Sequence, residues 1–196
     1  MKTIKTETQT VNLYYDNCRP AAFARDWIPS RTLACIKIFD YDNYDDYVKR
    51  GLSQKPARHY HRSIRLGYTT TVDQYDYRNE RLREIQEINE SKPIRQGREM
   101  DKSYKSPYKI YPMTFCDRHH FVLLLCIDPI GKIVGYMEFY IVGEFAQTSR
   151  LLGHSYDLRN GIMNQIFVAA FKVCKVRGVR IFCYAEWESG TEGLKY

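Results

Sequence analysis

The sequence predicts an α/β (α+β) fold with a mixed, largely antiparallel central sheet and flanking helices. Two apolar runs, 121–127 and 132–142, are separated by the turn sequence Asp-Pro-Ile-Gly, which is typical of a strand hairpin. From Ile162 to Val176 apolar side chains recur every three or four residues, which is the period of a helix. A further apolar run follows at 179–185. A strand, a helix and a second strand in that order form the crossover that parallel pairing requires.

The first half of the chain contains shorter apolar stretches. Residues 33–39 are mostly apolar, and the acidic, tyrosine-rich segment 40–47 that follows them predicts a polar loop. Residues 58–68 alternate weakly between polar and apolar side chains, which favours the first strand of the core. We therefore expect two parts: an N-terminal extension over residues 1–57 that packs on the core, and a core domain over residues 58–196.

A helix is predicted next, over residues 72–90. Its apolar residues, among them Ile85 and Ile88, share one helical stripe, and Pro93 ends the pattern. Residues 95–100 then predict an exposed basic loop.

The C-terminal part gives a short strand, a polar loop and the long helix. Residues 149–154 predict the strand, which ends at the polar loop 155–161. Gly178 lies just beyond the helical pattern, where glycine commonly stops a helix.

The predicted helix is entered through Arg159, Asn160 and Gly161. Backbone N–H groups at a helix start have no partner within the helix and lie at its positive end, so they can bind an anion. Gly161 has no Cβ, which would let an anion approach the backbone closely. A tight loop that needs glycine for its own conformation explains the same residue, and the sequence leaves both interpretations open.

Composition places the chain among globular proteins. It has 196 residues, 44% hydrophobic and 27% charged, with a formal net charge of +7. That length supports one domain with a core, and that amino-acid composition argues against disorder of the whole chain. No apolar run approaches the roughly 18 residues that span a bilayer, and the first ten residues lack a signal-peptide segment. The expected location is cytoplasmic.

The six cysteines are scattered along the chain, at Cys18, Cys35, Cys116, Cys126, Cys174 and Cys183. Four of them lie in apolar runs, where free cysteine packs as a small hydrophobic side chain, so no disulfide framework is expected. Metals could bind Cys116 with His119 and His120, or His59 with His61 on one face of a predicted strand. Neither cluster has a partner pair at zinc-like spacing, so no metal site is predicted.

Positive charge is concentrated in the first half. Residues 1–112 carry 21 Lys and Arg against 15 Asp and Glu, a net of +6, whereas residues 113–196 carry 9 against 8, a net of +1. The segment 49–65 has six cations and no acid, and 12 of the 17 tyrosines also precede residue 113. Cations interleaved with rings suit nucleotides, because phosphates attract cations and bases stack on rings, although such a run is more often a solvated face.

These C-terminal features resemble the GNAT N-acetyltransferase superfamily. In that family a strand leads into a loop of the pattern R/Q-x-x-G-x-G/A, whose amides hold the pyrophosphate of acetyl-CoA. Residues 151–154 resemble the end of that strand, 159–164 resemble the loop, and 179–185 resemble the next strand. The resemblance covers residues 115–196. It departs at Leu158, which stands where the loop has Arg or Gln, with Arg159 one place late, and at Met163, which stands where the loop has its last Gly or Ala.

The resemblance implies acetyl-CoA, or another acyl-CoA, as the cofactor. The residues that would hold it are Leu151, Leu152, Gly153, Arg159, Asn160, Gly161, Ile162, Met163 and Asn164. Residues 193–196 resemble the opening of the family's next helix, so the GNAT-like sheet would lack its last helix and strand elements. A homo-oligomer could complete the sheet edge.

The function that the resemblance implies is acyl-CoA-dependent N-acyl transfer, by direct attack of an amine acceptor on the thioester. The candidates for moving the amine proton are Glu138, His154, Tyr156 and Glu186. The side chains expected at the acceptor are Arg95, Arg98 and Tyr104. A solvent-facing, loop-capping or packing role explains each proton-transfer candidate equally well.

Two further functions stay open. Small basic proteins of the same fold, such as the phage Mom-like protein, modify DNA bases, and the basic, tyrosine-rich first half would suit a nucleobase amine as acceptor. A non-catalytic nucleic-acid-binding protein would explain why Met163 departs from the loop pattern. An amine-bearing acceptor and nucleic acid are the expected partners, and no membrane partner is expected.

Overall fold

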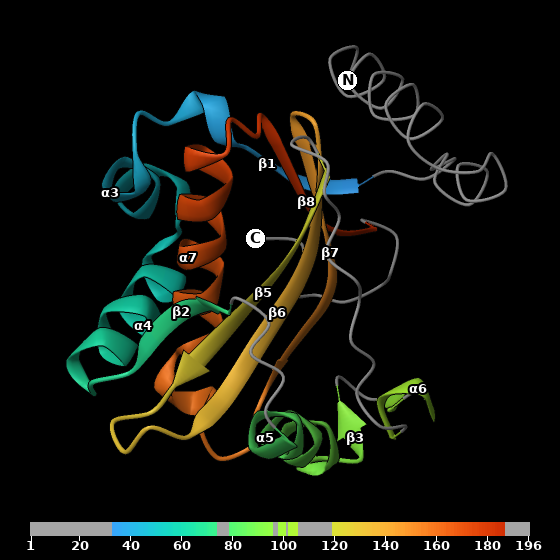
Figure 1. Ribbon diagram of the computed structural model, residues 1–196. Helices are drawn as coiled ribbons and strands as arrows, with labels where there is room; N and C mark the ends of the chain where they lie inside the picture. The colour runs from blue at the N-terminus through green and yellow to red at the C-terminus, as the bar shows by residue number, and fades with distance from the viewer. Residues whose placement is uncertain (1–32, 74–78, 96–97, 101, 106–118, 187–196) are drawn as a thin grey trace, which may run out of the picture.

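A six-stranded mixed sheet in the order β1-β8-β7-β6-β5-β2 organises the protein (Figure 1). The computed structural model describes residues 33–73, 79–95, 98–100, 102–105 and 119–186. The strands of the sheet are β1 (Leu33–Lys37), β2 (Thr69–Asp73), β5 (His119–Ile127), β6 (Ile133–Val142), β7 (Phe145–Gly153) and β8 (Ile181–Glu186). Neighbouring strands pair antiparallel except β7 and β8, which are parallel. A separate short ribbon pairs β3 (Ile94–Arg95) with β4 (Arg98–Glu99).

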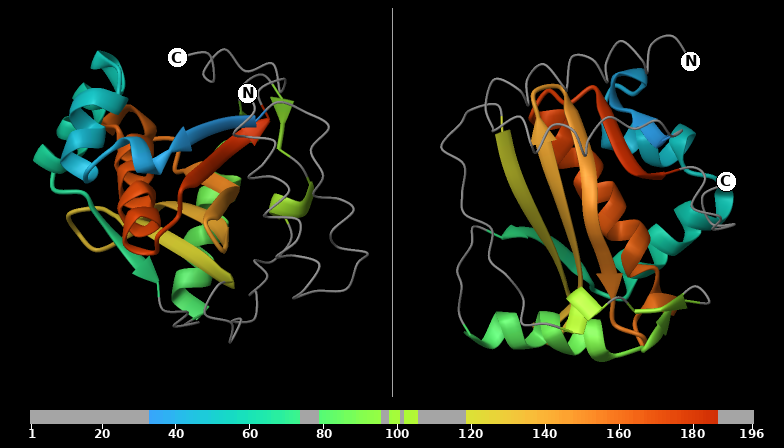
Figure 2. Two further views of the ribbon diagram at one scale, coloured as in Figure 1. Left: turned by 90° about the horizontal axis from the view of Figure 1, so that it is seen from above. Right: turned by 90° about the vertical axis from the view of Figure 1, so that its right-hand side faces the viewer.

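Helices lie on both sides of the sheet (Figures 1 and 2). One side carries α4 (Gln54–Arg65), α7 (Ile162–Val176), the short α3 (Tyr44–Asp46) and the turns η2 (Ile38–Asp40) and η3 (Tyr47–Gly51). The other side carries α5 (Asn79–Glu90) and α6 (Lys102–Lys105), and the turn η4 (Leu158–Asn160) leads into α7. Within the described ranges, none of these helices has the length and apolar character needed to cross a membrane.

Alternation along β5 divides the core into two layers. Val122 and Leu124 belong to the same buried cluster as the apolar residues of α7, whereas Leu123 and Leu125 pack with Ile88 of α5. Successive side chains of a strand point to opposite faces. Because helices cover both faces, this strand is apolar throughout rather than alternating.

The predicted hairpin and long helix are confirmed. Strands β5 and β6 pair along their length, and the turn between them is held by Asp128 Oδ1, which accepts hydrogen bonds from the backbone N–H of Ile130 at 3.0 Å and of Lys132 at 2.8 Å. The helix α7 ends at Val176, and Gly178 follows with φ +72°, the left-handed conformation expected of a glycine stop.

The strand predicted over residues 58–68 is wrong, because residues 54–65 form the helix α4. The side of α4 that faces the core carries small and polar residues at helical spacing, including the half-buried His59 and the fully buried Ser63. Such a stripe contains too little hydrophobic side chain for a periodicity argument to detect it. The boundary predicted between residues 57 and 58 lies within this helix.

The helix predicted over residues 72–90 is shorter than expected. Residues 69–73 form the edge strand β2, and the helix α5 spans residues 79–90. Three consecutive threonines and a valine explain the strand, because β-branched residues favour extended backbone.

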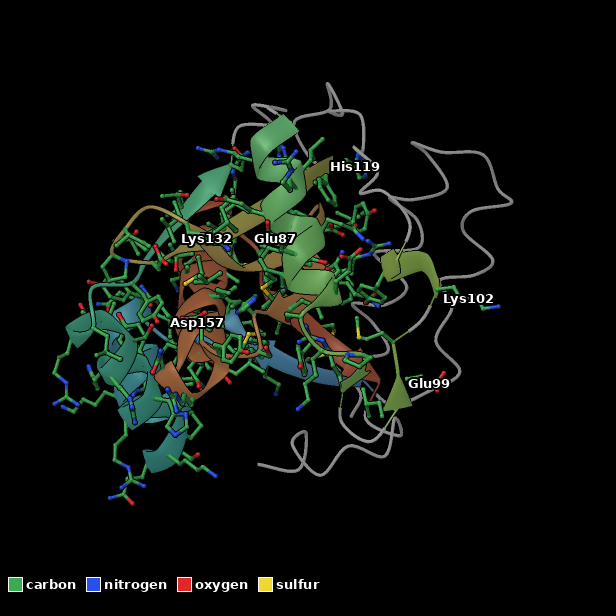
Figure 3. All side chains as sticks on the ribbon, turned by 90° about the horizontal axis from the view of Figure 1, so that it is seen from below. Glu87, Glu99, Lys102, His119, Lys132 and Asp157 are labelled. Atoms are coloured by element: carbon green, nitrogen blue, oxygen red, sulfur yellow. A yellow bond between two sulfur atoms is a disulfide. The ribbon has the colours of Figure 1, made fainter. Side chains whose placement is uncertain are left out.

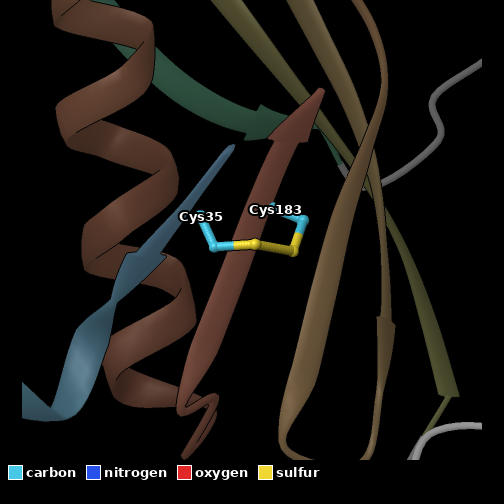
Figure 4. The surroundings of a disulfide bond; sticks show 2 residues. All are labelled: Cys35 and Cys183. Atoms are coloured by element: carbon cyan, nitrogen blue, oxygen red, sulfur yellow. A yellow bond between two sulfur atoms is a disulfide. The ribbon is translucent and has the colours of Figure 1, made fainter. Parts of the chain in front are cut away.

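A disulfide joins Cys35 of β1 to Cys183 of β8 (Figure 4). The two residues are directly opposed in the register of the two strands, with their Cα atoms 4.2 Å apart. They are 148 residues apart in the sequence, and only the pairing of β1 with β8 brings them together. Our expectation that cysteines in apolar runs stay free therefore does not hold for this pair.

Two other cysteines, Cys126 and Cys174, are free and buried. Burial raises the pKa of Cys126 to about 12 and also raises the pKa of Cys174. We expect both thiols to resist an aromatic disulfide reagent in the native protein and to react once it unfolds, as measured by peptide mapping.

The raised pKa of Cys126 also predicts how the free energy of unfolding changes at alkaline pH. Because an unfolded thiol ionises near pH 9, stability is fully present below that pH and falls as pH rises toward 12. If the disulfide reagent modified either Cys126 or Cys174 in the native protein at neutral pH, that result would contradict their burial.

Candidate functional site

Several loops meet at one end of the sheet. This end contains the last turn of α4, the turn between β5 and β6, the loop after β7 and the start of α7 (Figure 1). The β5–β6 turn is tied to α5 by Lys132, whose Nζ lies 2.8 Å from Glu87 Oε2 (Figure 3). Figure 3 is a view onto this end, and Asp157 in the loop after β7 lies on the same side of the protein.

Strands β7 and β8 separate at this part of the sheet. Their parallel pairing covers only three residue pairs, from Phe145 with Ile181 to Gln147 with Cys183. Beyond Gln147 the strand β7 continues to Gly153, and β8 turns away from it (Figure 2). The edge of β7 that faces β8 therefore has no strand partner over residues 148–153 among the described residues.

A histidine and a carboxylate lie at the open end of β7. His154 Nδ1 is 3.5 Å from Asp157 Oδ2, which is an ion-pair distance when the histidine is protonated. Tyr68 donates a hydrogen bond from its hydroxyl to Asp157 Oδ1 at 2.6 Å, and Asn160 Nδ2 donates to the Tyr68 hydroxyl at 2.7 Å. Burial, followed by the bond to Asp157, raises the pKa of Tyr68, so this hydroxyl stays protonated as a donor. We call His154 and Asp157 the dyad.

Tyr156, a predicted proton-transfer candidate, lies beside the dyad. Its ring centroid is 5.5 Å from that of His154, and the residue is 78% exposed. The structure therefore brings two of the four candidates together. Glu138 lies elsewhere on the sheet, and Glu186 ends β8 with a side chain outside the described part of the chain.

The start of α7 is packed against α4. Gly161 is buried with φ +85°, and a Cβ added there would lie 2.0 Å from the backbone oxygen of His59. Close approach of two helices and a left-handed backbone therefore explain this glycine, as the tight-loop interpretation required. Asn160 supports the dyad through Tyr68, and Arg159 is exposed.

The remaining residues expected at a cofactor surround Gly153. A Cβ added at Gly153 would lie 2.7 Å from Met163 Sδ and 2.9 Å from Ile162 Cδ1, so this glycine lets β7 pack on the helix start. Leu151 and Leu152 belong to the two different core layers, and Asn164 is half-buried.

Arg95 reaches the open edge of β7. Its Nη1 donates to the backbone oxygen of Gly153 at 2.9 Å, and its Nη2 donates to the oxygen of Ile88 at 2.7 Å and to Ser91 Oγ at 3.0 Å. The exposed basic loop predicted here is therefore wrong for Arg95, which is half-buried in β3 and whose pKa burial lowers. The side chain of Arg98 lies outside the described residues.

A buried ion pair lies further along the sheet face that α5 and α6 flank. Glu138 is fully buried in β6, and its Oε2 is 3.8 Å from Arg150 Nε on the directly opposed residue of β7. The Arg150 guanidinium lies 4.8 Å from the ring centroid of Tyr104 in α6. Burial, together with the negative charge of Glu138, raises the pKa of the nearby Tyr136 above its usual range.

Replacing Arg150 with Met should lower the free energy of unfolding by about 3 kcal/mol, because Glu138 would stay buried without this counter-charge. Urea denaturation measures the change. The double variant Glu138→Gln with Arg150→Met should recover most of the loss, because the buried carboxylate and its cation are then removed together. Equal stability of the single and double variants would contradict this account.

The four histidines weighed as metal ligands lie on two different elements. His59 and His61 lie on α4 rather than on a strand, so they do not share one face as expected. His119 and His120 begin β5, and Cys116 lies outside the described residues. Among the residues that the structure describes, no group of three or more metal-binding side chains is found.

Solved structures with the same fold include two proteins of one kind. L-PGS from Bacillus licheniformis has a TM-score of 0.57 with 19% identity, covering 84% of this chain and 49% of that one. The C-terminal domain of a putative lysylphosphatidylglycerol synthetase from Agrobacterium fabrum has a TM-score of 0.53 with 15% identity, covering 80% and 46%. This chain thus spans about half the length of each. No family model and no curated protein matches the chain.

These findings correct the resemblance to the GNAT superfamily. The two structures named above are L-PGS and a putative lysylphosphatidylglycerol synthetase domain, and neither supports GNAT membership, acetyl-CoA or a Mom-like DNA-modifying activity. The protein has a mixed α+β fold with a mostly antiparallel sheet. The motif was misleading because its central glycine has a packing role here, at the contact of α4 with α7.

Proposed function

We propose that this chain is an acyltransferase domain that moves an aminoacyl group from an activated ester to the hydroxyl group of a phospholipid headgroup. One observation carries the proposal: the dyad lies at the end of β7, beside the strand edge that β8 leaves open. The likeness in fold to lysylphosphatidylglycerol synthetase domains supports the class of reaction.

In this proposal His154 is the general base. Asp157 orients the imidazole through Nδ1. Tyr68 holds Asp157 in place by donating to its carboxylate, and Asn160 in turn donates to the Tyr68 hydroxyl. The Nε2 atom then accepts the proton of the acceptor hydroxyl while its oxygen attacks the acyl carbon of the ester. When the tetrahedral intermediate collapses, the ester C–O bond breaks and the same proton passes to the leaving oxygen.

The open edge of β7 offers groups that stabilise the developing oxyanion. The N–H of His154 donates a hydrogen bond to the backbone oxygen of Val134 on β6. Because the backbone groups of successive residues in a strand point to opposite edges, the N–H and the oxygen of Gly153 face the open edge of β7. Arg95 binds the Gly153 oxygen there and adds positive charge to the same edge. The N–H of Gly153 and the Arg95 guanidinium are the donors that we propose for the oxyanion.

The experiment supplies radiolabelled lysyl-tRNA as the ester and phosphatidylglycerol in mixed micelles as the acceptor, and measures label in the lipid phase. A parallel arm supplies acetyl-CoA and a polyamine, because the acyl-CoA donor and amine acceptor stay untested predictions. Label in the lipid that depends on His154 supports the proposal. Label only in the polyamine, or in neither acceptor, would overturn it.

A further inference from the structure

Three aliphatic side chains are exposed at the end of the sheet that carries the dyad. Ile130 in the β5–β6 turn is 88% exposed, and Ile64 and Leu66 at the end of α4 are 48% and 44% exposed. We call these three residues the apolar tip. Large aliphatic side chains gathered at one place on a surface mark an interaction site more often than single ones do.

The register of the sheet brings the two halves of the tip together. Thr69 of β2 pairs with Ile127 of β5, and the two strands are antiparallel. The segment just before Thr69, which carries Leu66, therefore lies beside the turn that follows Ile127. A Cβ added at Gly67 would lie 3.2 Å from Pro129 Cγ, which confirms that the two segments touch.

The turn that carries Ile130 is pre-formed. Asp128 Oδ1 accepts two backbone hydrogen bonds within it, and Lys132 ties it to Glu87 of α5 (Figure 3). A side chain on a fixed turn loses little conformational freedom when it inserts into a partner.

Three exposed arginines lie on elements next to the apolar tip. Arg62 and Arg65 are exposed on the last turn of α4, a helix that contains no acidic residue. Arg159 is exposed in the turn that follows the dyad. Aliphatic side chains next to arginines match a surface with an apolar interior beneath an outer layer of negative charge.

We infer that this end of the protein docks on an anionic lipid surface. The apolar tip enters the boundary between headgroups and acyl chains, and Arg62, Arg65 and Arg159 contact headgroup phosphates. A nucleic acid would use the cations and aromatic rings but would gain nothing from a largely exposed isoleucine. The sequence predicted no membrane partner because no run spans a bilayer, but surface contact needs no such run.

The inference deepens the proposed function and rests on it for the identity of the lipid. With the tip in the membrane, the dyad would face the headgroup layer, because both lie at the same end of the sheet. An acceptor hydroxyl on a headgroup could then reach His154 without leaving the bilayer.

The test is co-sedimentation of the full chain with vesicles of phosphatidylcholine, alone or mixed with phosphatidylglycerol, without any donor. We expect binding to the anionic vesicles that weakens with added salt. Ile130→Ser should lower the partition coefficient about tenfold, since burial of an isoleucine side chain is worth at least that factor. Val176→Ser is the matched control, because Val176 is 80% exposed at the far end of α7 and should bind as the wild type does.

Two outcomes would overturn the inference: no binding to the anionic vesicles, or equal partition of the Ile130 and Val176 variants. Binding to single-stranded RNA without vesicle binding would favour nucleic acid, rather than lipid, as the partner of this protein. His154→Ala should bind vesicles normally but transfer at least about a hundredfold more slowly, whereas Ile130→Ser should keep transfer in micelles and lose it on vesicles. Failure of docking and failure of transfer are therefore distinguished.

Discussion

Replacing His154 with Ala should lower the rate of aminoacyl transfer by about a hundredfold to ten-thousandfold while the protein stays folded. The imidazole is the basic side chain of the dyad at the open edge of β7, with Asp157 3.5 Å from its Nδ1. Without it the acceptor hydroxyl must lose its proton to water, which is a far weaker base at neutral pH. The side chain is 22% exposed, so its removal leaves a small surface depression rather than a core cavity.

The measurement is the initial rate with lysyl-tRNA and phosphatidylglycerol over a range of acceptor concentrations. We expect kcat to fall and KM to change little, because a base acts in the transition state rather than in binding. His154→Gln is the control for packing and hydrogen bonding, and it should be as slow as the Ala variant. Full activity in either variant would mean that another group accepts the proton.

The elements that could be predicted are those with strong local periodicity. The β5–β6 hairpin follows from two apolar runs around an Asp-Pro-Ile-Gly turn, and α7 follows from its apolar spacing and from Gly178. The helix α4 could not be predicted, because its packing face contains small and polar residues such as Ser63, whose hydroxyl bonds Gln165 inside the protein. That face is recognisable only when α7 lies against it.

The candidate site could be predicted in part. The loop after β7 drew attention to His154 and Tyr156, which the structure brings together. The roles of Asp157 and Tyr68 were missed because the bond between them joins residues 89 positions apart. A signal existed for Asp157, which stands three residues after a histidine in a loop. Arg95 was named for its charge, but its contact with Gly153 depends on how β3 lies against β7.

The second prediction concerns Gly161, where both the left-handed backbone and the contact with α4 disfavour any side chain. Gly161→Ala should lower the free energy of unfolding by about 3 to 5 kcal/mol. A left-handed backbone costs an alanine about 1 to 2 kcal/mol, and the added Cβ would meet the His59 backbone oxygen at 2.0 Å. Relief of that contact requires α4 to move away from α7, and the hydrogen bond between Ser63 and Gln165 lies in the same helix contact.

Gly178→Ala is the control that separates the cost of the contact with His59 from the cost of the left-handed backbone. Gly178 has φ +72° at the other end of α7, and a Cβ added there meets nothing within 4 Å. This variant should therefore lose only the backbone term, about 1 to 2 kcal/mol. The difference between the two variants in chemical denaturation measures the packing of α4 on α7. If both lose the same stability, the helices do not approach as closely as the structure describes, and an anion at the start of α7 becomes the better explanation of Gly161.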